Sequence, residues 1–289
     1  SVQSVVVDAA DRLWLLDTGR LAPWPAAFGG PKLVAVDLRG NRVVRQILLP
    51  QQVALPSTYL NDVRFDLRWG VGGMAFITDS SPDGPNGLIV VDLNSGRSWR
   101  RLHDHPSTKA VPEFLPIVEG QPLVNRPPGQ PPRPLQTGVD GIAIDARGER
   151  LYYCPTASRR LYSVSVVALT DERLPDTKVA ETVLDHGEKG VSDGLEADDQ
   201  DRIYTTNYEH NAILRRRTDG VWETLVRDER LLWPDSLSIS ANGYLYITAN
   251  QFHRRPEYHA GKDLRTKPYY LFRTPIDAGP VALGVASIG

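Results

Sequence analysis

One pattern recurs five times along the chain and limits what the chain can fold into. Each copy has a short apolar run, a polar turn, and a second apolar run that usually ends in Asp or Asn. The clearest copy runs from Val191 to Asn207, and the others lie at residues 5–17, 61–79, 140–154 and 235–250. Short apolar runs separated by turn residues predict paired antiparallel β-strands.

Two further strands are predicted after most of these pairs. In the fourth repeat, Asp219-Gly220 separates the runs 212–216 and 222–226, and this dipeptide favours a hairpin because both residues tolerate positive φ. Helical periodicity is almost absent from the chain. Four antiparallel strands in each repeat, at intervals of roughly 40 to 80 residues, predict an all-β fold: a β-propeller in a single domain over residues 1–289.

The predicted number of blades is six, with one blade incomplete in the sequence. Five repeats are complete or nearly so, and the fifth has a third strand at residues 269–275. The weak apolar tail 281–288 is expected to be its fourth strand or the start of another unit. The chain starts at Ser1 directly on a repeat, which favours a missing N-terminal part. A five-bladed ring is the alternative.

Loop lengths distinguish the two faces of the predicted propeller. Turns within the strand pairs, such as residues 241–243, are short, whereas the long connections fall on the opposite face. Functional residues gather on loops held by a rigid frame, so we expect the face with the long connections to be the working face. Its longest loop is the proline-rich insertion 103–138, which is either a lid or a stiff surface loop.

Polar residues occupy equivalent positions at this face. The innermost strands are preceded by Gln3, Asn61, Asp140, Asp193 and Asp235, and the second strands end in Asp17, Asp79, Asn207 and Asn250. Oxygen ligands suit Ca²⁺ or Mg²⁺, and the predicted metal ligands are Asn61, Asp140, Asp193 and Asp235. The same carboxylates are alternatively a site for a substrate ammonium, or a general base with a raised pKa. A purely structural role is the third interpretation, because Asp-Gly turns and polar channels are common in such folds.

The candidate site residues follow from these positions. We predict Asp193 and Asp140 as catalytic carboxylates. The predicted ligand-binding residues are Asn61, Asp62, Asp79, Asn207, Asp235 and Asn250, together with Tyr208 and Phe252, whose rings could stack on an aromatic ligand.

Composition and missing motifs exclude several function classes. The net charge of -2 gives no indication of a nucleic-acid or membrane partner, and no apolar run is long enough to cross a bilayer. No phosphate-binding glycine loop is present, so no organic cofactor is expected. Cys154 is the only cysteine and is expected to be a buried, unreactive thiol. The expected partner is a small molecule. The missing start favours a secreted or periplasmic location over a cytoplasmic one.

Several segments resemble the major royal jelly and Yellow protein family. Arg12–Gly19 is similar to the family's RLWVLDTG segment. The likeness continues in order through Tyr59–Asp62, Ala75–Ser80, Gly87–Leu93, Gly141–Ile144, Leu151–Tyr153, Leu161–Val164, Trp233–Asp235 and Asn250–Phe252. The resemblance implies a six-bladed propeller. It also implies a function among those of family members, some of which convert dopachrome-like indole quinones while others bind biogenic amines. The short chain without paired cysteines is more similar to a bacterial relative than to an insect secreted form.

A more distant resemblance links the chain to the gluconolactonase and senescence-marker propellers. Those proteins hold a divalent metal with an axial glutamate, whose position is taken here by Gln3. We therefore expect an isomerase- or tautomerase-like enzyme that acts on an aromatic or quinonoid substrate. A non-catalytic binder of amines is the first alternative, and a metal-dependent lactonase is the second.

Overall fold

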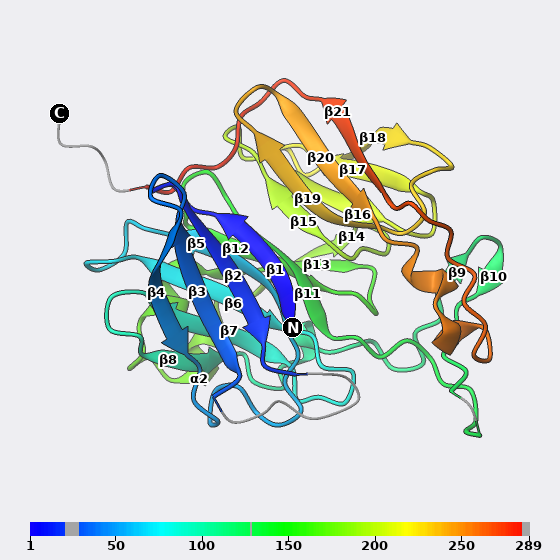
Figure 1. Cartoon of the computed structure of the whole chain (residues 1–289), viewed down its shortest axis with the longest axis horizontal. Helices are drawn as coiled ribbons and strands as arrows, with labels where there is room; N and C mark the ends of the chain where they lie inside the picture. Colours follow the sequence, from blue (N-terminus) through cyan, green and yellow to red (C-terminus); the bar gives the residue numbers. More distant parts are fainter. Residues whose placement is uncertain (21–28, 128, 285–289) are drawn as a thin grey trace.

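Five antiparallel sheets make up most of the protein (Figure 1). The computed structural model describes residues 1–20, 29–127 and 129–284. The first sheet contains β1 (Val2–Val7), β2 (Arg12–Thr18), β3 (Pro31–Asp37) and β4 (Arg42–Leu48), and the second contains β5 (Leu60–Asp66), β6 (Met74–Asp79), β7 (Gly87–Asp92) and β8 (Ser98–Arg101). The third contains β11 (Val139–Ile144), β12 (Arg150–Pro155), β13 (Arg160–Ser165) and β14 (Leu184–Glu188).

The remaining elements complete the fold. The fourth sheet contains β15 (Leu195–Ala197), β16 (Ile203–Asn207), β17 (Ala212–Arg216) and β18 (Trp222–Arg227), and the fifth contains β19 (Pro234–Ser240), β20 (Tyr244–Ala249) and β21 (Tyr270–Pro275). Two short helices, α1 (Val166–Thr170) and α2 (Asp176–Ala180), separate β13 from β14. A small hairpin of β9 (Ile117–Val118) and β10 (Gln121–Pro122) lies in the proline-rich insertion. In the part of the chain that the structure describes, no helix is long and apolar enough to cross a membrane.

The prediction of six blades is wrong, because each of the five repeats forms one blade sheet, and the remaining sheet among the described residues is only the two-stranded β9–β10 hairpin. The start of the C-terminal tail, which was expected to supply another strand, contacts the fourth and second sheets instead. Pro280 forms a bridge with Asp198 at the end of the fourth sheet, and the Leu283 carbonyl accepts a hydrogen bond from the Leu67 amide. The described part of this tail is therefore not the fourth strand of the last blade. Residues 285–288 of the predicted strand lie outside the described residues.

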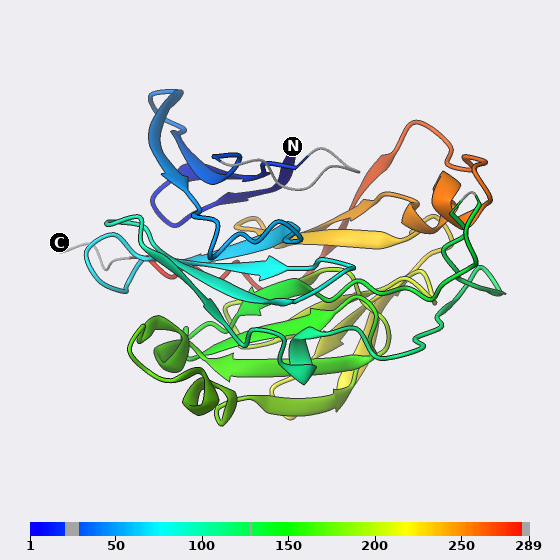
Figure 2. The same ribbon diagram turned by 90° about the horizontal axis from the view of Figure 1, so that it is seen from below.

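Figure 2 shows the first sheet, in dark blue, next to the second, in cyan. Apolar side chains join each sheet to the next. Trp14 and Leu16 of the first sheet pack with Val63 and Ile77 of the second, and three further clusters join the second to the third, the third to the fourth and the fourth to the fifth. Each fully buried large aliphatic side chain contributes about 1.5–3 kcal/mol. In the described ranges, no such cluster joins the last sheet to the first. Val5 on the outer face of β1 is accordingly 58% exposed.

The proline-rich insertion contacts the loops that follow β16 and β20. The Ile117 amide donates to Glu209 Oε1 at 2.8 Å, and the Arg126 amide donates to the Glu257 carbonyl at 2.6 Å. Glu119, at the tip of the β9–β10 hairpin, accepts from Arg254 Nε at 3.0 Å and lies 2.8 Å from His253 Nε2. Figure 1 shows the hairpin beside η2 (Phe252–Arg254) and η3 (Pro256–Tyr258). The insertion is thus tied to the fifth sheet by charged contacts.

Glu119 supplies a test of this attachment. We expect Glu119→Gln to expose the insertion to limited proteolysis at neutral pH, because the charged contact with Arg254 is lost. The hydrogen bond from Arg254 holds the pKa of Glu119 below its ordinary value. The carboxylate therefore stabilises the docked insertion above its unfolded-state pKa, and this contribution is lost as the pH falls through the lower, folded-state pKa. Glu113→Gln, an exposed change in the same insertion, is the control. Equal cleavage rates for the two variants would contradict this role.

Candidate functional site

β-bulges aim the candidate residues out of the innermost strands. The register between the first and second strands shifts at Gln3 in β1, at Asn61 and Asp62 in β5, at Asp140 and Gly141 in β11, and at Asp235 and Ser236 in β19. A bulge bends the strand and redirects a side chain at the rim of a sheet. Four of the five blades therefore present their polar residue by the same local device.

A threonine of the second strand secures the backbone at the equivalent position in three blades. The backbone amides of Asp62, Asp193 and Ser236 donate to the hydroxyl groups of Thr78, Thr206 and Thr248 respectively, each at 3.0 Å. These bonds satisfy amides that the irregular register leaves without a strand partner. In the third blade this position is taken by Cys154, and Thr156, two residues further on, contacts the carboxylate of Asp140.

Two glycines allow neighbouring blades to approach closely. A Cβ atom on Gly141 would lie 2.4 Å from the Asp193 carbonyl oxygen, and one on Gly194 would lie 2.1 Å from the Asp235 carbonyl oxygen. Both distances are far below van der Waals contact, and the obstructing atoms are backbone. The glycine after each aspartate therefore brings the next aspartate close, rather than only forming a turn.

Substitution of Gly194 tests this packing. We expect Gly194→Ala to lower the free energy of unfolding by more than about 2 kcal/mol, because the methyl group forces two strands apart. Gly187→Ala is the control, since a Cβ there meets nothing within 4 Å and only the positive φ of 83° opposes it, at about 1–2 kcal/mol. Chemical denaturation of both variants measures the difference. A smaller loss for Gly194→Ala than for Gly187→Ala would contradict the close approach.

Asp140 and Asp193 share one hydroxyl group. Thr156 Oγ1 lies 2.9 Å from Asp140 Oδ2 and 3.4 Å from Asp193 Oδ1, and Trp233 Nε1 donates to Asp193 Oδ2 at 2.5 Å. Both aspartates are buried. Asp235, which is half-buried, accepts from Asn250 Nδ2 at 2.5 Å. The structure thus brings together the two predicted catalytic residues, with Asp235 next to Asp193.

Burial and mutual repulsion raise the pKa of all three carboxyl groups. Desolvation is the largest cause for each, and it raises the pKa of Asp193 to about 6. The pKa values of Asp140 and Asp235 lie well above the ordinary value, because the charge of Asp193 adds to the desolvation. Asp62 also has a raised pKa through burial, partly offset by Arg64. A cluster of this kind holds protons near neutral pH.

The first and second blades complete the rim of this cluster. Gln3 Nε2 donates to Asn61 Oδ1 at 3.0 Å, and Asn61 Nδ2 donates to Ser80 Oγ at 3.0 Å. The Tyr59 hydroxyl donates to Gln3 Oε1 at 2.7 Å. Desolvation, together with the charge of Asp140, raises the pKa of Tyr59.

Trp233 holds Asp193 in place from an unusual backbone conformation. Its φ is 58°, a value that is an outlier for a bulky residue and costs about 1–3 kcal/mol. Its ring stacks on Tyr208 with centroids 3.9 Å apart and contacts Phe252 at 5.0 Å. Tyr208 is fully buried and donates to the Thr156 carbonyl. Tyr208 therefore packs against the Trp233 ring and bonds to the Thr156 backbone. Phe252 is half-buried at the edge of this ring stack.

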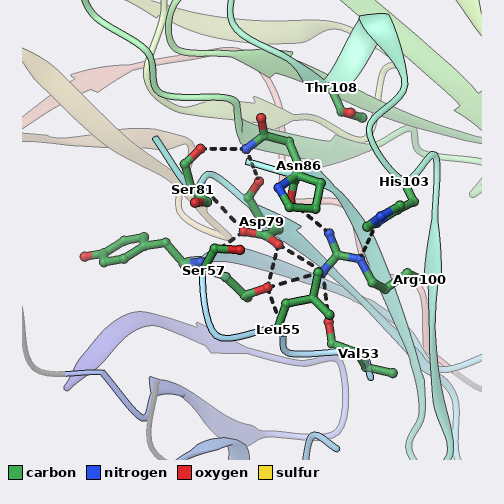
Figure 3. A network of polar contacts seen from close by, with 12 residues as sticks. Val53, Leu55, Ser57, Asp79, Ser81, Asn86, Arg100, His103 and Thr108 are labelled. Carbon is green, nitrogen blue, oxygen red and sulfur yellow. Dashed lines mark hydrogen bonds and ion pairs between the residues drawn. The ribbon is translucent and has the colours of Figure 1, made fainter. Parts of the chain in front are cut away.

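Asp79 and Asn207, two predicted ligand-binding residues, lie in other networks. Asp79 is fully buried and pairs with Arg100 at 2.9 Å, in a network that joins the loops around residues 53–58 and 81–86 (Figure 3). Asn207 accepts from the His210 amide at 3.2 Å and stabilises the turn after β16. Neither side chain is bonded to the carboxyl cluster in the described residues.

The donor set does not fit a divalent metal as it is arranged. Among the residues the structure describes, no group of three or more His, Cys, Asp or Glu side chains is positioned to hold a metal ion. The carboxylate oxygens of the cluster face Trp233, Thr156 and Asn250, which donate hydrogen bonds to them. We therefore derive no chemical step through Ca²⁺ or Mg²⁺.

Together these features define a β-propeller with a proton-holding carboxyl cluster where its innermost strands meet. The major royal jelly protein family model matches residues 1–270, so the chain belongs to that family. It is 28% identical to major royal jelly protein 7 of Apis mellifera over 62% of this chain, and spans 38% of that protein's length. It is 24% identical to the Yellow-related salivary protein SP04 of Phlebotomus argentipes over 86% of this chain and 64% of that protein.

A solved structure of low sequence identity has the same fold. It is a calcium-binding protein, regucalcin, of Agrobacterium tumefaciens strain C58. The TM-score is 0.54 at 14% identity, and the match covers 97% of this chain and 91% of that one. At this identity the similarity concerns the fold alone. The predicted relation to the royal jelly and Yellow proteins is confirmed by the family match.

Sequence reasoning missed the residues that hold the cluster together. Thr156 and Trp233 contact its carboxylates directly, and neither was predicted to be part of the site. A visible signal existed for the threonines that hold the bulge amides, because Thr78, Thr206 and Thr248 recur in three second strands, but Thr156 lies two residues beyond that position. The role of Trp233 depends on its positive φ, which no sequence pattern indicates.

Proposed function

We propose that the carboxyl cluster binds a small organic molecule with a cationic nitrogen and moves a proton on it, as an isomerase or tautomerase of aromatic or quinonoid compounds does. One observation carries this proposal. Asp140, Asp193 and Asp235 lie together, and in the described part of the chain none of them forms an ion pair with Lys or Arg. Buried carboxyl groups without a paired cation hold protons or attract a positive ligand.

The two predicted catalytic residues differ in proton affinity. Asp193 accepts hydrogen bonds in its charged form from Trp233, and its pKa of about 6 leaves it ionised at neutral pH. Asp140 has a pKa well above the ordinary value, chiefly through desolvation, and keeps its proton longer. Asp193 is therefore the proposed base and Asp140 the proposed acid. A base and an acid linked through Thr156 can remove a proton at one atom of a substrate and supply one at another.

Two half-buried aromatic side chains are the proposed contacts for the substrate ring. Tyr59 bonds to Gln3 and senses the charge of Asp140, and Phe252 packs at the edge of the Trp233 ring. Trp233 is only 1% exposed, so it positions Asp193 and does not itself offer a stacking surface. Amide groups of Asn61 and Asn250 at the rim are the proposed partners for a substrate oxygen.

Binding without turnover is the second candidate, because the same carboxylates pair with an amine without any reaction. The excess of negative charge in the cluster supports it. A metal-dependent lactonase has less support, since the donor set does not fit a metal. An exported location, secreted or periplasmic, belongs to the proposal as well. It is supported by relatives named for royal jelly and saliva.

A panel of small molecules tests the proposal and separates the candidates. Catechol-derived quinones, indole and catechol amines, and lactones are each assayed for binding by calorimetry and for turnover by absorbance. We expect turnover of a quinonoid compound and binding of amines. Binding of amines with no turnover of any compound would support the second candidate. Turnover of lactones alone, dependent on added Ca²⁺, would contradict both.

A further inference from the structure

An arginine, a serine and a histidine of the third blade form a chain of hydrogen bonds. Arg150 Nε donates to Ser163 Oγ at 2.7 Å, and Ser163 Oγ lies 2.7 Å from His186 Nε2. The serine hydroxyl has a single proton and already accepts from Arg150, so it donates this proton to His186 Nε2. The ring proton of His186 therefore lies on Nδ1. In the part of the chain that the structure describes, this N–H has no hydrogen-bond partner.

Arg216 of β17 lies on the side of the fourth blade that faces the third blade. It pairs in register with Ile203 of β16 and with Trp222 of β18, and directly paired residues project to the same face of a sheet. Ile203 and Trp222 pack in one cluster with Tyr152 of the third blade. The Tyr152 ring lies 5.2 Å from the ring of His186. Arg216 therefore faces the part of the third blade that carries His186.

Neither Arg150 nor Arg216 is neutralised by a carboxylate. Arg150 donates to neutral oxygens, the carbonyls of Ser163 and Thr182, at 2.9 and 2.7 Å. Arg216 Nε is buried without a hydrogen-bond partner. Arg202 also has one buried nitrogen without a partner, but its Nε pairs with a carboxylate at 2.6 Å. In the described ranges, no Asp or Glu lies within ion-pair distance of Arg150 or Arg216.

The two guanidinium charges act on the histidine between them. Desolvation is the largest cause that lowers the pKa of His186, to about 4, and the charges of Arg216 and Arg150 lower it further, while Asp185 raises it. Asp185 is itself paired with Arg160 at 2.7 Å. The imidazole is therefore neutral at neutral pH and keeps its Nδ1–H as a donor. Donors beside uncompensated positive charge favour a ligand that accepts hydrogen bonds and carries negative charge.

We propose that Arg150, His186 and Arg216 bind a divalent oxyanion of the sulfate or phosphate class between the third and fourth blades. Two guanidinium groups balance the two negative charges, and the anion accepts hydrogen bonds from Arg216 and from His186 Nδ1. The planar guanidinium fork matches the oxygens of such an anion. The site lies away from the carboxyl cluster, because Arg150 begins β12 whereas Thr156, which contacts Asp140, follows its end. The proposal does not depend on what the cluster does.

Calorimetry with sodium sulfate at constant ionic strength tests the site. We expect the wild-type protein to bind one sulfate, and to bind acetate more weakly, because acetate balances only one charge. Arg216→Met should weaken sulfate binding at least about tenfold, since a charged donor is removed. It should not lower thermal stability, because Arg216 Nε has no partner to lose.

A neighbouring arginine and a phosphate ester complete this experiment. Arg217→Met breaks an exposed pair with Asp219, and as the matched control it should leave the affinity for sulfate unchanged. Phenyl phosphate and inorganic phosphate distinguish the source of the anion. Tighter binding of phenyl phosphate would assign the site to an ester on a larger molecule, and equal affinity would assign it to the free anion.

Histidine NMR of the wild-type protein keeps the test independent of variant folding. We expect sulfate to raise the pKa of His186, because a bound anion stabilises the charged imidazolium, and chloride at the same ionic strength to leave it unchanged. The signal is assigned by its loss in His186→Gln. No saturable binding of sulfate, equal affinity of Arg216→Met and Arg217→Met, or a pKa of His186 that does not respond to sulfate would each overturn the proposal.

Discussion

Asp193→Asn is expected to reduce turnover of any compound that the wild-type protein converts by about 10²–10⁴-fold, the usual contribution of a positioned acid or base. The asparagine oxygen can still accept the hydrogen bond from Trp233 Nε1, so the variant should fold. It lacks only the group that takes the proton. Steady-state kinetics with the best substrate of the panel measures the loss.

Two comparisons make this result specific. Asp83→Asn, an exposed change in the loop after β6, is the matched control and should leave turnover unchanged. Asp140→Asn should also lower turnover. Because Asp140 is the proposed acid and desolvation raises its pKa well above the ordinary value, its loss should remove the alkaline limb of the pH profile and leave the limb that Asp193 sets near pH 6. Full turnover by Asp193→Asn would show that another residue is the base.

Arg100→Met is expected to cause the largest loss of stability, about 3–5 kcal/mol, because it leaves a buried carboxylate without its partner. Asp79 is fully buried, and it accepts hydrogen bonds from Arg100 Nη1 at 2.9 Å and Thr58 Oγ1 at 2.7 Å. Arg100 also donates to the Val53 carbonyl at 2.8 Å and to His103 Nδ1 at 3.0 Å. Figure 3 shows these contacts joining three loops around one guanidinium. Chemical denaturation measures the loss.

The double variant and an exposed pair complete this experiment. Asp79→Asn combined with Arg100→Met should lose less stability than the sum of the single variants, since no unpaired charge stays buried. Lys178→Met breaks an exposed pair with Glu181 and should cost less than about 1 kcal/mol. If Arg100→Met costs no more than Lys178→Met, the network does not hold these loops together.

The repeats predicted the architecture because strand pairing leaves a local signal. Alternating apolar residues and turn dipeptides such as Asp219-Gly220 mark the strands and hairpins, and the sheets form where the repeats lie. The number of blades was predicted incorrectly. Whether the tail forms another strand depends on long-range contacts such as Leu67 with Leu283, and no local pattern reports these.

The candidate site was predictable in part for the same reason. Equivalent positions in successive repeats come together around an axis, so Asp140, Asp193 and Asp235 could be grouped from the sequence. Asp79 ends a second strand and was grouped with them, yet Arg100 from β8 pairs with it, and that pairing reaches across β7. Asp-Gly turns were considered only as part of the structural interpretation, whereas at Gly141 and Gly194 the missing side chains bring neighbouring blades together. Such packing is visible only when the blades are placed side by side.

Proton release on ligand binding tests the central claim most directly. The claim is that the cluster of Asp140, Asp193 and Asp235 holds protons near pH 6 in the free protein and is the site of an organic cation. Calorimetry of an aromatic quaternary ammonium compound in two buffers of different ionisation enthalpy, near pH 6, counts the protons exchanged. A bound cation favours ionised carboxylates, so we predict that protons are released on binding and that fewer are released by Asp193→Asn. Binding without any proton release, or equal release by both proteins, would contradict the account.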